Sequence, residues 1–364
     1  MSILSYSIKR VVFAIPTLFI ISLLSFSLMR YDFTVGPVTI PWWGDQNRLV
    51  LLESTRIKNP INPLAGIEAN PQISEAAKQQ IRSVMGLDQP FHIQYWRWLT
   101  HFFSFHPSAL INGQWHQFFT PSLGTTFAGE DVLQILITRG KNTLLLNSLV
   151  FLFSWTIAIP LGVMAALKWR SAYDRLLTVF TAIGMSLPSF VLALLLALVV
   201  VKTGILPFGG LYSNNFSQLS FFEKLLDLLK HLILPAFVLT VGSISSVQRQ
   251  MRGNLLDVLA EDYIRTARAK GLHEFFVIYK HAVRNAINPL ITLLGYELSS
   301  LLGGSILIET VLGYPGLGQL TYKAVLETDT NLVMATIMLS SMMLVLGNLL
   351  ADILLKLTDP RIEV

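Results

Sequence analysis

Six long apolar segments dominate this sequence and restrict the folds that it can adopt. A helix of roughly 20 mainly apolar residues crosses a bilayer core about 30 Å thick. The segments that reach or approach this length are 11–29, 143–167, 176–201, 231–247, 287–311 and 332–355. Charged residues make up 13% of the chain, about half of what soluble domains carry. We therefore predict an all-α polytopic membrane protein with six transmembrane helices.

The first segment and the prolines need separate consideration. Residues 11–29 follow Lys9 and Arg10, as the apolar core of a cleaved signal peptide would. The run is longer than such a core and does not end in a small-x-small site, so we expect it to remain as a span. Prolines also fall inside the segments, where neighbouring helices can satisfy the freed backbone groups; they are Pro16, Pro160, Pro188 and Pro235.

Lys and Arg in short loops set the orientation of a membrane protein. They concentrate in 168–175 and in 249–284, the loops after the second and fourth segments. These loops and both chain termini are therefore expected in the cytoplasm, and the sizeable segment 30–140 is expected outside. The chain then divides into a cytoplasmic N-terminus with the first helix, an extracytoplasmic segment and a five-helix core domain, at 1–29, 30–140 and 141–364.

The extracytoplasmic segment contains two helical patterns. Residues 73–87 read as a helix that Ser74 caps and that ends near Met85-Gly86. Residues 92–103 form a second candidate with a stripe of aromatic side chains, of the kind that lies at the headgroup level. We expect an interfacial helix with a small packed cap.

The cytoplasmic stretch 254–286 combines charge with an apolar stripe. It reads as two amphipathic helices separated at Gly271, a glycine suited to the positive φ of a helix C-terminus. Apolar residues recur at three- and four-residue steps in both halves; they are Leu256, Leu259, Tyr263, Ala267, Phe276, Tyr279 and Val283. On pattern alone, the stretch fits a compact docking knob and a juxtamembrane helix bound to anionic lipid equally well.

Motifs of enzymes and cofactor sites are missing from the sequence. It has no GxxxxGK[ST] phosphate loop, no HExxH and no GxSxG. It has no cysteine, and its four histidines between 92 and 116 match no metal-ligand spacing. The net charge of +5 is scattered over loops and does not indicate nucleic-acid binding. We therefore predict no catalytic residue, no cofactor and no metal, and we interpret Pro315-Gly316 as the centre of a type II turn.

Carboxylates inside the apolar segments are few. Glu309 and Asp352 lie near segment ends, where we expect Glu309 to reach water. Glu297 lies near the middle of the fifth segment and needs a partner or a wet cavity. One candidate function for such a chain is an ion-coupled secondary transporter, but that class would need more mid-membrane carboxylates and two related halves. An intramembrane enzyme has no supporting motif.

Several motifs together resemble one family. RTARAKG at 265–271 and HAVRNAINP at 281–289 resemble the EAA loop of ABC-importer membrane subunits, in its dipeptide/oligopeptide/nickel branch. SLPSF at 186–190 and GGSILIETVLGYPGLGQL at 303–320 are similar to other parts of that branch. The sequence departs from the general pattern, which has Glu-Ala-Ala at 265–267, and Ser122 stands where the branch often has Asp.

The resemblance implies a type I ABC-importer permease fold in the bacterial inner membrane, without enzymatic activity. It also implies the partners: a second permease, in a heterodimer, two cytoplasmic ATPases and an extracytoplasmic solute-binding protein that delivers peptides or similar solutes. The loop residues that would couple to the ATPase are Leu259, Tyr263, Arg265, Thr266, Ala267, Arg268, Ala269, Lys270 and Gly271. Glu297, Ser186 and Ser189 are the candidates for lining the translocation pathway, and Glu297 fits a hydrogen-bonded residue inside the helix bundle equally well.

Overall fold

The protein is described by a computed structural model that divides into two compact units. It describes residues 3–30, strands between 33 and 57, and residues 74–84, 88–102, 123–126, 129–291, 293, 297, 305–327 and 329–358. The first unit contains residues 1–15, 137–322 and 339–364, and the second contains residues 16–136 and 323–338. The long helices α1 (Ile3–Arg30), α6 (Val132–Leu167) and α16 (Thr330–Thr358) each contribute to both units.

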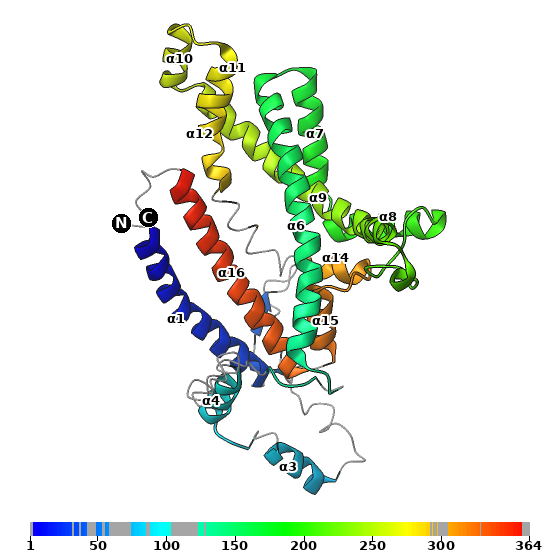
Figure 1. Cartoon of the computed structure of the whole chain (residues 1–364). Coiled ribbons are helices and arrows are strands. Elements are labelled where there is room, and N and C mark those ends of the chain that lie inside the picture. The colour runs from blue at the N-terminus through cyan, green and yellow to red at the C-terminus, as the bar shows by residue number, and fades with distance from the viewer. Residues whose placement is uncertain are drawn as a thin grey trace, which may run out of the picture. The chain divides into compact units, whose positions relative to one another are not determined.

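The first unit is helical (Figure 1). Besides parts of α1, α6 and α16, its described elements are α7 (Ala172–Ser186), α8 (Ser189–Thr203), the 3₁₀ turn η2 (Phe216–Gln218), α9 (Phe221–Leu259), α10 (Asp262–Ala269), α11 (Glu274–Phe276), the π-helix η3 (Val277–Val283), α12 (Arg284–Ala286), α14 (Ile306–Val311) and α15 (Leu317–Leu326). α7 and α8 both pack on α9, and α14 packs on α8 and α9.

Three helices in the described part of the chain are long and apolar enough to cross a membrane. They are α6, α9 and the stretch Asn331–Leu350 of α16. The helices α7 and α8 pass the same test together, but they meet at an angle of 93°. The apolar part of α1, Val12–Ser27, is shorter, and most of 292–304 in the predicted fifth span lies outside the described residues.

The prediction of one continuous helix over 176–201 is wrong at Pro188. The preceding residue, Leu187, has φ −86° and ψ 116°, which is the extended conformation that a following proline favours. By contrast, Pro16, Pro160 and Pro235 lie within unbroken helices. Leu187 therefore lies outside the helical conformation, and the chain bends sharply between α7 and α8.

Side-chain caps mark the start of two helices in this unit. Ser171 precedes α7, and its hydroxyl accepts a hydrogen bond from the Asp174 amide. Ser220 and Glu223 form a reciprocal capping box at the start of α9, which satisfies amides that a helix N-terminus leaves unpaired. α8 ends at Gly204, whose φ is 65°.

The loops of this unit meet in the pairs that their charge predicts. The amide of Gly210, between α8 and α9, donates to the carbonyl of Gly313, between α14 and α15, at 3.0 Å. Both loops are poor in Lys and Arg and lie on the outer side in the predicted topology. The basic turn between α6 and α7 meets the basic end of α9 through Asp174 and Arg252. Loops expected to share a side of the membrane are therefore in contact.

The second unit requires an addition to the all-α prediction. Four short strands lie in segment 30–140, β1 (Phe33–Val35), β2 (Val38–Pro41), β3 (Leu49–Leu52) and β4 (Thr55–Ile57). β1 pairs with β4 and β2 pairs with β3, antiparallel and in one shared register. β-branched side chains in these strands favour extended structure, a signal that a search for helices overlooks.

The two helices predicted in this segment are confirmed. α3 (Glu75–Val84) begins after Ser74, whose hydroxyl accepts from the Ala77 amide, and α4 spans Phe91–Phe102. Tyr95 of α4 is buried against α1, where its hydroxyl lies 2.7 Å from that of Ser22 and its ring packs edge-on against Phe26. The aromatic stripe of α4 therefore packs on α1 within this unit.

Candidate functional site

The stretch 254–286 contains the last turns of the long helix α9, and the rest of it folds as a series of short helices after α9 (Figure 1). α9 continues to Leu259, the chain breaks at Ala260-Glu261, and α10 follows. The predicted division into two helices therefore misses one break. A second difference is the π-helix η3, a geometry that is rare in proteins and is often found at functional positions.

The corner after α10 is formed as predicted at Gly271. The φ of Gly271 is 75°. Its amide donates to the carbonyl of Arg268 at 2.9 Å, and the amide of Leu272 donates to that of Ala267 at 3.4 Å. These two bonds are the pattern of a Schellman C-cap, in which a glycine takes the left-handed position. A Cβ atom at Gly271 would meet nothing within 4 Å, so the backbone conformation alone favours glycine.

Buried apolar side chains hold this segment against α6 and α9. Ile264 of α10 and Val277 of η3 are fully buried. They belong to one apolar cluster with Val163 of α6 and with Met251 and Leu255 of α9. Leu259 and Ala267 are partly buried against the same cluster. Ile264 therefore anchors the segment, although the predicted stripe ran one residue away, through Tyr263.

The opposite face of the segment exposes apolar side chains. Tyr263 is 42% exposed, and its hydroxyl accepts a hydrogen bond from the Asn285 side chain at 2.8 Å. Four further apolar residues are about half exposed on the corner and the helices after it. We define these four as the apolar patch: Leu272, Phe275, Phe276 and Tyr279. Large exposed apolar patches mark surfaces that bind a partner or a membrane.

The remaining residues predicted for coupling lie on α10 and at the corner after it. Lys270 at the corner and Ala269 before it are exposed. Thr266 is exposed and donates its hydroxyl hydrogen to the Asp262 carbonyl at 2.9 Å. Arg265 lies 3.3 Å from the Asp262 carboxylate, with both side chains mostly exposed, a type of pair that contributes little to stability.

Arg268 is already paired within the chain. Its Nη2 atom donates to Glu274 Oε1 at 2.8 Å, and its Nε atom lies 3.2 Å from both carboxylate oxygens. This hydrogen bonding from Arg268 lowers the pKa of Glu274. The ion pair joins α10 to α11 across the Gly271 corner and leaves Arg265 and Lys270 as the more available positive charges of the predicted set.

Glu297, the central carboxylate of the predicted fifth span, has the partner that the sequence required. Trp155 of α6 donates its indole hydrogen to Glu297 Oε2 at 2.6 Å, and Ser243 of α9 is also hydrogen-bonded to this carboxylate. Ser186 and Ser189 lie exposed on either side of the α7–α8 bend, with the Ser186 hydroxyl donating to the Ala182 carbonyl. A role of these residues in a pathway stays a prediction.

Glu309 does not reach water, contrary to the prediction from sequence. It is fully buried, with an exposed fraction of 0%. Its carboxylate accepts from the hydroxyls of Thr143 and Ser305, at 2.9 and 2.6 Å, and from the amide of Gln319 at 2.9 Å. Glu309 thus joins α6, α14 and α15 in one polar cluster.

Two glycines, Gly316 and Gly318, leave the space that the Glu309 carboxylate occupies. A Cβ atom at Gly316 or Gly318 would collide with the Glu309 carboxylate. The predicted type II turn at Pro315-Gly316 is wrong, because the positive φ of 63° belongs to Gly313 instead. Here glycine leaves room for a buried carboxylate, which the sequence alone does not distinguish from a glycine that permits a turn.

The helical core matches a known family. Residues 158–364 match the family described as "Binding-protein-dependent transport system inner membrane component". The chain belongs to this family. The match includes the whole of 254–286, together with Glu297 and Glu309, and it identifies the chain as a non-catalytic membrane subunit, an ABC-importer permease.

Similarity to individual permeases extends over the full length. The chain is 34% identical to "Oligopeptide transport system permease protein AppB" of Bacillus subtilis (strain 168), over 99% of both chains. It is 33% identical to "Glutathione transport system permease protein GsiC" of Salmonella paratyphi A, also over 99% of both chains. A solved structure of the MetNI methionine ABC transporter is 20% identical, covering 62% of this chain and 97% of that chain, with a TM-score of 0.48.

Sequence reasoning missed two parts of this permease. Ile264 was overlooked because its neighbour Tyr263 also fits a helical stripe and is apolar enough to be assigned to the core. The ion pair between Asp174 and Arg252, residues 78 positions apart, was also missed. The sequence did indicate that Asp174 lies at the start of a helix, since Ser171 and Asp174 have the Ser-x-x-Asp spacing of a capped helix N-terminus.

Proposed function

We propose that this permease is the membrane subunit of a peptide importer. The observation that carries the proposal is the full-length similarity to a permease named for oligopeptide transport. In this proposal the chain forms a translocation pathway with a second permease of similar fold. Two cytoplasmic ATPases drive transport, and a solute-binding protein delivers the peptide from outside.

The chain crosses the bacterial inner membrane six times in this proposal, with both termini in the cytoplasm. Its parts are the N-terminus and first span at 1–29, the extracytoplasmic segment 30–140 and the core domain 141–364. The positive charge of 168–175 and 249–284 supports this orientation. The contacts that group the remaining loops at the other end of the unit are consistent with it.

We call residues 254–286 the coupling segment. It docks on the ATPase through its exposed face. The apolar patch of Leu272, Phe275, Phe276 and Tyr279 supplies area that a groove can bury. Arg265 on α10 and Lys270 at the corner add exposed positive charge to the same segment, where acidic groups of a partner would be attracted. Because Ile264 and Val277 anchor the segment in the core, a push on the patch reaches α6 and α9.

The pathway of this proposal runs past Glu297, near the α7–α8 bend with Ser186 and Ser189. Glu297 is half-buried, and its carboxylate is oriented by the Trp155 indole. A carboxylate in the apolar part of the membrane suits a transient contact with the ammonium group of a peptide. If Glu297→Gln leaves peptide uptake and peptide preference unchanged, this role is excluded.

Reconstitution of the complete transporter tests the function. The permease pair and its ATPases are reconstituted in proteoliposomes, and the binding protein is added with the molecule that it carries, which mass spectrometry identifies. We expect a peptide in the binding protein and ATP-dependent accumulation of that peptide. Uptake that proceeds without ATP and follows an ion gradient, or a binding protein that carries no peptide, would contradict the proposal.

A further inference from the structure

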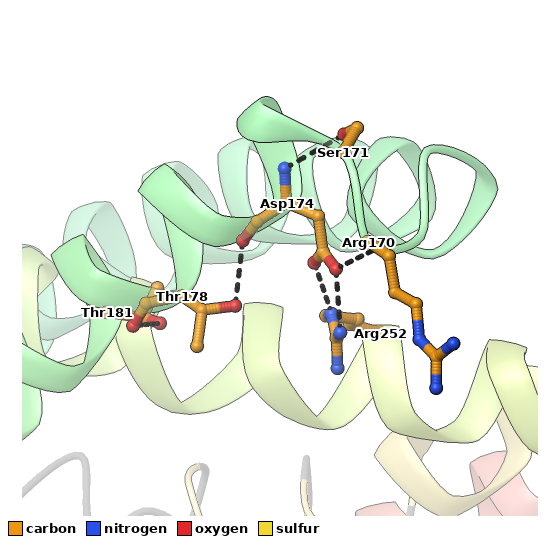
Figure 2. Close-up of polar contacts among 6 residues, drawn as sticks. All are labelled: Arg170, Ser171, Asp174, Thr178, Thr181 and Arg252. Atoms are coloured by element: carbon orange, nitrogen blue, oxygen red, sulfur yellow. Dashed lines mark hydrogen bonds and ion pairs between the residues drawn. The ribbon is translucent and has the colours of Figure 1, made fainter.

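An ion pair joins the first turn of α7 to α9 (Figure 2). Arg252 Nε donates to Asp174 Oδ1 at 2.6 Å, and Arg252 Nη2 donates to Asp174 Oδ2 at 2.9 Å. The two side chains are 25% and 5% exposed, respectively. Such a two-bond contact between a guanidinium and a carboxylate fixes both distance and orientation.

Asp174 also fixes the turn that precedes α7. The amide of Arg170 donates to Asp174 Oδ2 at 3.0 Å, and the amide of Asp174 donates to the Ser171 hydroxyl at 3.2 Å. Arg170 has a φ of 61°, a left-handed conformation that is uncommon for a residue other than glycine. Figure 2 shows the Asp174 carboxylate between the Arg170 backbone and the Arg252 guanidinium, so one side chain holds a bent turn and a second helix together.

Arg252 belongs to the part of α9 that carries the coupling segment. Its neighbour Met251 and the following Leu255 are fully buried in the cluster that includes Ile264 of α10 and Val277 of η3. The guanidinium therefore extends from the same packed body that anchors the coupling segment. A displacement of that body moves Arg252 with it.

A second contact holds the other end of α7 on α9. The Cβ of any larger residue at Gly184 would collide with the Ser245 hydroxyl, so the two helices lie very close there. Two residues after the end of α7, Pro188 starts the sharp bend into α8. α7 is thus held to α9 near both of its ends, and its last turn leads directly into the bend with Ser186 and Ser189.

We infer that Asp174 and Arg252 are positioning residues through which movement of the coupling segment is passed to α7 and to the α7–α8 bend. This inference rests on the proposed function. Separating the pair would leave a largely buried carboxylate without its partner, which is costly. The contact is therefore kept when the coupling segment moves, and α7 follows α9 as one body.

The test uses the complete transporter in proteoliposomes, with the binding protein as purified and the peptide that it carries. The variants are Asp174→Asn, Arg252→Lys, which keeps the charge but loses the two-bond geometry, and the double variant Asp174→Asn/Arg252→Gln, which leaves no charge unpaired. The control on α9 is Asp257→Asn, at an exposed position. The measurements are the amount of assembled complex, basal ATP hydrolysis, its stimulation by the binding protein, and peptide taken up per ATP.

We expect the double variant to assemble and to keep basal ATP hydrolysis, while uptake per ATP falls about tenfold, within the range of residues that couple distant sites. Arg252→Lys should retain part of the coupling, and the Asp257→Asn control should match the wild type. Wild-type uptake per ATP in the double variant would overturn the inference. Failure of all three variants to assemble would also overturn it, because the pair would then be needed for the fold. A wild-type complex that the binding protein does not stimulate would instead refute the proposed function.

Discussion

At the residue scale, two glycines of this permease show how differently the same residue type is used. Gly271 has a φ of 75° and open space around it, whereas Gly316 is pressed against the Glu309 carboxylate. Glycine is required at the first position by conformation and at the second by space. A sequence shows neither φ nor neighbours, so Gly271 was predictable only because a helical pattern ended there.

Replacement of Gly271 by alanine should destabilise the corner of the coupling segment. A side chain at positive φ costs about 1 kcal/mol or more. The matched control is Gly253→Ala, inside α9, where a Cβ atom meets nothing within 4 Å and alanine should stabilise the helix by about 0.5–1 kcal/mol. Thermal unfolding of the purified permease in detergent should therefore shift in opposite directions for the two variants. Equal shifts would show that the conformation of Gly271 carries no cost.

Replacement of Glu309 by glutamine tests the polar cluster around it. The carboxylate accepts three hydrogen bonds, and the amide group of glutamine cannot accept at both ends. One buried donor should be left unpaired, at a cost of about 1–3 kcal/mol. The control is Glu327→Gln at an exposed position. We expect a lower unfolding temperature for Glu309→Gln alone, and an unchanged one would mean that the cluster adapts to a neutral side chain.

At the element scale, the sequence predicted where helices lie better than which face each one buries. The C-terminal end of α10 and the whole of α4 were predicted closely, because a glycine and a periodic aromatic run mark them. The prediction placed the buried face of α10 at Tyr263, one residue from the buried Ile264. Tyrosine is apolar enough to fit a core position and polar enough to remain outside. Asp174 and Arg252 were not predicted as partners, since nothing local relates residues 78 positions apart.

The ion pair between Arg268 and Glu274 should make the corner between α10 and α11 sensitive to acid. Because the pKa of Glu274 is lowered in the folded state, the pair stabilises the corner fully above the ordinary glutamate pKa of about 4.3. That stabilisation is lost as the pH falls through the lower, folded-state value. Since both side chains are about half exposed, the effect is small, within about 1 kcal/mol.

Hydrogen exchange of the corner amides measures this effect. After correction for intrinsic rates, protection of residues 270–276 should decrease below pH 4 in the wild type. Glu274→Gln should show the weaker protection already at pH 7 and little further loss on acidification. Asp262→Asn serves as the control. It removes the highly exposed ion pair between Asp262 and Arg265 and should leave the corner unchanged. A pH response that persists in Glu274→Gln would assign it to another group.

At the scale of the whole molecule, charge and connectivity agree on the grouping of loops. Loops rich in Lys and Arg meet through Asp174 and Arg252, and two loops poor in them meet through Gly210 and Gly313. The number of membrane crossings depends on helix length and hydropathy. Three helices are long and apolar enough in the described part of the chain, and the bent pair α7–α8 adds a fourth. A direct measurement of sidedness therefore decides the topology.

The chain contains no cysteine, so single introduced cysteines report their side of the membrane without a background. Gln79→Cys in α3, Asn214→Cys between α8 and α9, and Lys270→Cys at the coupling corner are all at exposed positions. We expect an impermeant maleimide to label the first two on intact spheroplasts and the third only after permeabilisation, because the basic loops stay in the cytoplasm. Recovery of each variant from the membrane in the wild-type amount is the control for a native fold. Labelling of Lys270→Cys from outside would invert the topology and would separate the coupling segment from any cytoplasmic ATPase.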